Sequence, residues 1–164
     1  MVAAPNAHPD KEPLRTALLA VLRAELSACE AAHRSTVDGA THAEARAENA
    51  KDTRSLEQSY LARGQALRAV ALREAIEALR AMPLGDFRGR RAALGALATL
   101  EDDDGETRAV WLVPDGAGGV LEDGLRAVSV TTPLGRALVG RCEGDAVEAP
   151  RGGAQVTYTL TSLV

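Results

Sequence analysis

Residues 131–148 read TTPLGRALVGRCEGDAVE, and this stretch contains a complete short helix between two segments of strand character. Thr132 can cap the helix through its hydroxyl group. Pro133 suits the first helical position, because the N–H that proline lacks would have no intrahelical partner there. An apolar face at helical spacing follows and ends at a glycine suited to a left-handed exit: Leu134, Ala137, Leu138 and Gly140. The stretch therefore predicts a helix of one to two turns that covers a sheet.

Strand-like segments surround this helix in the second half of the chain. Leu94, Ala96, Ala98 and Leu100 recur at every second position, which predicts a strand, and residues 107–114, 127–130 and 156–160 predict further strands. Residues 101–105 (EDDDG) predict a hairpin turn, and residues 115–119 predict a glycine-rich turn. Asp102, Asp103 and Asp104 could bind a metal ion, but three acids before a glycine are more typical of an exposed turn. Strands with one short helix predict a small α+β domain over residues 83–164.

The first half has helical periodicity instead. One apolar stripe begins after Pro13 and fades before residues 35–39 (STVDG), where Asp38 and Gly39 predict a turn. A second helix is expected from a capping box at Thr41 and Glu44 to Met82. Its apolar positions are Leu56, Tyr60, Leu67, Val70, Leu72, Ile76 and Leu79. Two helices joined by a short turn predict an antiparallel coiled-coil finger over residues 13–82.

Composition excludes several classes of protein. The net charge is −4, and residues 83–164 carry 8 basic and 12 acidic side chains, which disfavours sequence-specific DNA binding. No apolar run approaches the roughly 20 residues that a membrane-spanning helix needs. Residues 1–12 lack the apolar segment of a signal peptide and are expected to form a disordered lead-in. With only Cys29 and Cys142, far apart in sequence, we expect a cytoplasmic protein, and we expect it to be monomeric.

The quoted stretch resembles the signature of the C-terminal domain of bacterial Gre transcript-cleavage and elongation factors. The residues in register with that signature are Pro133, Arg136, Ala137, Leu138, Gly140, Gly144, Asp145 and Tyr158. The resemblance implies an FKBP-like domain that docks at the rim of the secondary channel of bacterial RNA polymerase, with the finger entering that channel. It also implies that Thr132, Pro133, Leu134 and Arg136 belong to the docking surface.

The finger tip departs from the Gre pattern. In the family, two acids in an Asp-Leu-Ser-Glu-Asn-Ala sequence help to hold a Mg²⁺ ion shared with the polymerase, whereas residues 45–50 here read ARAENA. Glu48 is retained but Ala45 replaces the first acid, which should weaken Mg²⁺ retention. If the second helix starts at Thr41, Glu44, Glu48 and Asp52 lie on one helical face and could compensate. Alternatively, Glu44 serves the cap and the other two acids are simply solvated.

These observations predict a regulator without catalytic activity or a cofactor of its own. It would bind RNA polymerase and modulate elongation or initiation, with Mg²⁺ at most shared with the polymerase active site through Glu48. The alternative is a factor that stimulates the polymerase to cleave backtracked RNA. A third hypothesis is an FKBP-type prolyl isomerase or chaperone. It is disfavoured because such a site needs an aromatic-lined pocket and this half has only Phe87, Trp111 and Tyr158.

Overall fold

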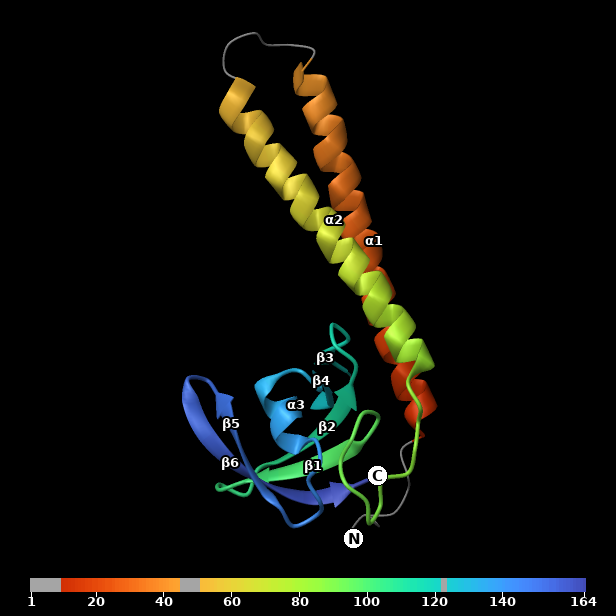
Figure 1. The fold of residues 1–164 in the computed structure, drawn as a ribbon, viewed down its shortest axis with the longest axis vertical. Helices are drawn as coiled ribbons and strands as arrows, with labels where there is room; N and C mark the ends of the chain where they lie inside the picture. Colours follow the sequence, from red (N-terminus) through yellow and green to blue (C-terminus); the bar gives the residue numbers. More distant parts are fainter. Residues whose placement is uncertain (1–9, 45–50, 122–123) are drawn as a thin grey trace.

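The chain folds into a helical finger and a curled sheet that packs against its base. The structure is a computed structural model that describes residues 10–44, 51–121 and 124–164. Helices α1 (Lys11–Glu44) and α2 (Lys51–Ala81) run antiparallel, as Figure 1 shows. The finger that they form projects away from the sheet. The predicted α+β class and helical hairpin are therefore confirmed.

The second half forms one sheet of six strands around a short helix. The strands are β1 (Leu97–Asp102), β2 (Thr107–Val113), β3 (Gly119–Val120), β4 (Arg126–Ser129), β5 (Ala146–Arg151) and β6 (Ala154–Leu163). Their order in the sheet is β3-β4-β2-β1-β6-β5, and only the β2–β4 pair is parallel. Helix α3 (Pro133–Leu138) lies within the curl of the sheet (Figure 1).

Alternation along the strands divides the core into two clusters. In β2, Trp111 and Val113 join the residues of the finger base, whereas Val110 and Leu112 join the cluster that contains Leu138 of α3. This division follows from the strand period of two, which turns successive side chains to opposite faces. The finger base and α3 therefore cover opposite faces of the sheet.

The first helix extends further than the sequence predicted at both of its ends. At its start, the Asp10 carboxylate accepts the N–H of Glu12, and Lys11 Nζ donates to the carbonyl oxygens of Gly85 (2.6 Å) and Val164 (2.8 Å). These contacts fix residues 10–12, all of which the sequence assigned to the lead-in; residues 1–9 lie outside the described part. Burial lowers the pKa of Lys11, an effect that Asp86 partly opposes.

The predicted turn at residues 35–39 is wrong, because α1 continues through it to Glu44. A glycine inside a helix costs only about 1 kcal/mol relative to alanine, so Gly39 does not end a helix by itself. The Thr36 hydroxyl donates back to the Ala32 carbonyl oxygen (2.9 Å), which satisfies this side chain within the helix. Thr41 and Glu44 accordingly lie at the end of α1 and do not cap α2.

The apolar positions predicted for α2 divide into a packed group and an exposed group. Leu72, Ile76 and Leu79 are buried against α1 and the sheet. Leu56, Tyr60, Leu67 and Val70 are instead 47–67% exposed. Periodicity identified the helix but not the face that is buried. Among the described residues, no helix combines the length and the apolar character needed to cross a membrane.

Candidate docking edge and finger tip

The N-terminus of α3 is fixed by hydrogen bonds to the end of β4. The Thr132 hydroxyl accepts the Gly135 N–H (3.2 Å) and donates to the Ser129 carbonyl oxygen (2.7 Å), which confirms the predicted cap. Position 135 has no room for a side chain, because a Cβ atom on Gly135 would lie 2.1 Å from the Ser129 carbonyl oxygen. The direction in which α3 leaves the sheet is therefore set by its own first turn.

The four residues predicted to dock a partner differ in their exposure. Pro133 and Arg136 are exposed on the outer side of α3. Leu134 is half-buried and packs against the core cluster beneath the helix, and Thr132 is half-buried with its hydroxyl engaged in the cap. Pro133 and Arg136 are thus available to a partner, whereas Thr132 and Leu134 fix the position of α3 on the domain.

A segment far away in sequence lies alongside the C-terminal end of α3. Gly140 leaves the helix with a φ of 84°, and its N–H donates to the Ala92 carbonyl oxygen (2.7 Å). The Ala92 N–H in turn donates to the Arg141 carbonyl oxygen (2.7 Å). Residues 90–92 are therefore part of this edge, which sequence reasoning missed because the pairing spans about fifty positions and leaves no local pattern.

Three acidic side chains within and beside the quoted stretch form hydrogen bonds within the domain. A Glu143 carboxylate oxygen accepts the Leu163 N–H (2.6 Å), and Asp145 accepts the Cys142 N–H (2.8 Å). Asp115, from the turn after β2, accepts hydrogen bonds from the hydroxyls of Thr131 (2.6 Å) and Ser129 (3.2 Å). These two bonds lower the pKa of the Asp115 carboxyl. All three carboxylates serve to hold the loops around α3.

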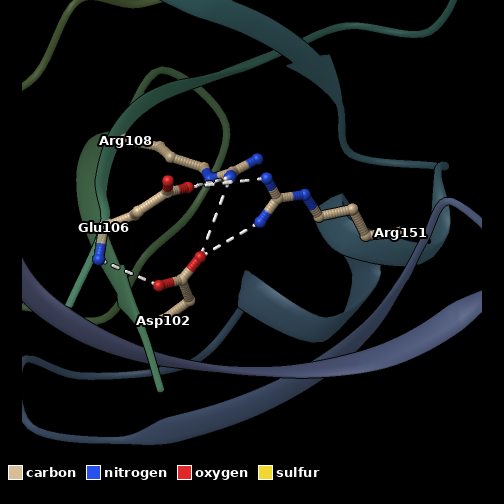
Figure 2. Close-up of polar contacts among 4 residues, drawn as sticks. All are labelled: Asp102, Glu106, Arg108 and Arg151. Carbon is tan, nitrogen blue, oxygen red and sulfur yellow. Dashed lines mark hydrogen bonds and ion pairs between the residues drawn. The ribbon is translucent and has the colours of Figure 1, made fainter. Parts of the chain in front are cut away.

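Asp102 is the centre of a polar network and not part of an exposed turn, as Figure 2 shows. Its side chain is only 3% exposed, and its carboxylate lies 3.0 Å from Arg151 Nη1 and 3.7 Å from Arg108 Nη2. The other carboxylate oxygen accepts the Glu106 N–H (2.9 Å). The predicted exposed turn is correct for Asp103 and Asp104 but wrong for Asp102. The network joins the β1–β2 hairpin to β5.

The second half of the chain matches the family model described as "Transcription elongation factor, GreA/GreB, C-term", over residues 88–163. Residues 88–163 are therefore similar to the C-terminal domain of GreA and GreB. The resemblance that the quoted stretch indicated is therefore confirmed for this domain. The match includes α3, its cap, the segment at 90–92 and the Asp102 network.

Curated relatives align with this chain over a similar length. GreA of Bradyrhizobium diazoefficiens is 37% identical over 76 residues, which are 46% of this chain and 46% of the relative. GreA of Ruegeria pomeroyi is 35% identical over 69 residues, covering 42% and 43% of the two chains. Both relatives are described as transcription elongation factors. The aligned part of this chain thus spans less than half of each relative.

Solved structures of Gre-related proteins align over most of the chain, but with low similarity. GreA factor homolog 1 (Gfh1) of Thermus thermophilus is 19% identical, covers 89% of this chain and 94% of its own, and has a TM-score of 0.42. A GreA/GreB factor from Nitrosomonas europaea is 16% identical, covers 62% and 89%, and has a TM-score of 0.37.

The acids proposed for the finger tip do not share one helix. Glu44 is the last residue of α1 and Asp52 the second residue of α2. Glu48 and the rest of the ARAENA sequence (45–50) lie outside the described residues. The hypothesis that Glu44, Glu48 and Asp52 lie on one helical face and compensate for Ala45 required a helix that starts at Thr41. Because α1 ends at Glu44, the hypothesis is wrong in its original form. Glu44 and Asp52 lie near the outer end of the finger.

Proposed function

We propose that this protein is a Gre-like transcription regulator that binds bacterial RNA polymerase at the secondary channel. The observation that carries the proposal is the Gre C-terminal domain at residues 88–163, attached to a long antiparallel finger. Docking would use the exposed side of α3, where Pro133 and Arg136 are available, and the finger would extend toward the active centre. In the same proposal the sheet domain is FKBP-like and the protein is a cytoplasmic monomer.

The sequence at the tip favours modulation of elongation or initiation over efficient RNA cleavage. Ala45 stands where the Gre pattern has an acid, and Arg46 adds a positive charge near Glu48. A divalent ion held between phosphate oxygens needs carboxylate ligands to offset its charge, and losing one weakens the site. The protein itself would not be an enzyme; any Mg²⁺ would be shared with the polymerase.

A binding measurement with bacterial core RNA polymerase tests the proposal. The full chain should bind, and an unlabelled GreA relative should displace it if both occupy the secondary channel. Pro133→Asp should weaken binding, because it places a charge on the exposed side of α3 without touching the core. Arg126→Glu, an exposed change at the far end of β4, is the matched control. Failure of the full chain to bind, or binding that GreA does not displace, would contradict the proposal.

A stalled, backtracked complex separates modulation from cleavage. We expect the protein to bind this complex and alter extension without shortening the RNA. Mg²⁺-dependent shortening that Glu48→Ala abolishes would instead establish the alternative, an active cleavage factor. Shortening that persists in Glu48→Ala would exclude a tip mechanism through this residue.

A further inference from the structure

Three arginine side chains gather at the C-terminal end of α3. Arg136 lies in the last turn of the helix and is exposed. Arg141 Nε donates to the carbonyl oxygen of Ala137 (3.3 Å), the residue next to Arg136. Arg91 Nη1 donates to the carbonyl oxygen of Gly140 (2.9 Å), two residues beyond the end of α3. Arg91 and Arg141 are therefore oriented by main-chain acceptors on the same short helix and its exit.

Among the residues that the structure describes, no acidic side chain forms an ion pair with these guanidinium groups. Across the described residues, ion pairs engage Arg15, Arg68, Arg73, Arg80, Arg88, Arg108 and Arg151 but none of these three arginines. Glu143 and Asp145, which are close to Arg141 in sequence, accept backbone N–H groups, and Asp86, the acid nearest to Arg91 in sequence, pairs with Arg88. The result is a concentration of positive charge on a half of the chain that has an excess of acidic residues.

Exposed apolar side chains are also present on α3 and at its exit, where the arginines lie. Val139 is 45% exposed directly after α3, and Pro133 is exposed at its start. None of the exposed residues named for this edge is aromatic; Trp111 and Tyr158 are buried in the sheet, and Phe87 is half-buried beneath Lys11. Single-stranded nucleic acid is usually held by stacking on aromatic rings, so this surface suits a protein partner better.

We propose that Arg91, Arg136, Arg141 and Val139 form one recognition surface for an acidic protein segment that also carries an apolar residue. Each planar guanidinium can pair with a carboxylate through two parallel hydrogen bonds, and Val139 offers the apolar contact. The inference deepens the proposed docking edge and rests on that function where it assigns the segment to RNA polymerase. It adds Arg91, Arg141 and Val139 to the residues expected from the family signature.

Nuclear magnetic resonance with the full chain tests the surface independently of the polymerase. The probe is a short peptide of glutamates and leucines at low salt, with a single-stranded RNA oligonucleotide of matched charge as competitor. We expect peptide-induced shifts at residues 91 and 136–141, and binding at least about tenfold weaker in the Arg91→Glu, Arg141→Glu double variant. Arg126→Glu reverses a single exposed charge elsewhere and should bind as the unmodified chain does.

Several outcomes would overturn the inference. They are the absence of shifts at this edge, equal binding by the correctly folded double variant, or preferential binding of the RNA at the same residues. Thermal melting establishes that the variants are folded, and Arg91→Gln with Arg141→Gln removes the charge without reversing it. Peptide binding at this surface combined with no binding to core polymerase would refute the proposed function while leaving the surface established.

Discussion

The outer part of the finger and the sheet domain differ in the solvent exposure of their apolar side chains. In the outer half of α2, Leu67 is 63% exposed and Tyr60 is 67% exposed. In the sheet, Leu100, Leu112 and Leu160 are completely buried. Burial of apolar surface stabilises a fold by about 25 cal/mol per Å², so the sheet domain and finger base supply most of this stabilisation.

Charged groups show the same contrast. The finger helices are joined by exposed ion pairs, Arg68 with Glu25 and Arg73 with Glu30. The sheet domain instead places Asp102 in a nearly buried position between two arginines. Solvated pairs contribute little, whereas a buried carboxylate must keep its partners. The outer finger is therefore the region whose sequence can change with the least effect on folding.

The largest expected effect comes from truncating a core residue at the finger base. Leu79→Ala should lower the free energy of unfolding by about 2–5 kcal/mol, because Leu79 is fully buried and leaves a cavity. Leu67→Ala, the same change on the exposed side of the same helix, should stay within about 0.5 kcal/mol. Urea denaturation measures both, and equal losses would contradict the division of the finger into a packed base and an open outer half.

An intermediate effect is expected from the buried carboxylate. Asp102→Asn should cost roughly 2–3 kcal/mol, since it removes the buried charge between two guanidinium groups and leaves them with the exposed Glu106 as their acidic neighbour. Asp104→Asn, an exposed change in the same hairpin, is the control. If the two variants unfold at the same urea concentration, Asp102 does not anchor the hairpins.

The smallest effect concerns the ion pairs of the finger. Arg68→Ala should cost about 0.2–1 kcal/mol at low salt, because both partners are roughly half exposed. The difference should shrink toward zero at about 1 M salt, where screening is strong. Urea titrations at two salt concentrations measure it, and a large loss that does not depend on salt would show that the outer finger is more tightly coupled than its exposure indicates.

Local patterns were sufficient to predict α3, the hairpin strands and the existence of the two helices. Thr132, Pro133 and Gly140 act within a few residues of themselves, so their roles as cap, first turn and exit can be predicted without the rest of the fold. The end of α1 could not be predicted, because the turn signal at Asp38-Gly39 competes with continuation of the helix. In the structure the helix continues to Glu44. The burial of Asp102 depends on Arg151, forty-nine positions away in sequence.

The sequence by itself determined the α+β class, the helical finger and the Gre-like signature, because periodicity, capping and turn chemistry are local properties. Only the tertiary structure decided which face of α2 is buried and which docking residues are exposed. It alone brought Arg91 to the carbonyl oxygen of Gly140 at the exit of α3. Those features arise from chain segments that pack together across long sequence separations, and no short pattern encodes that packing.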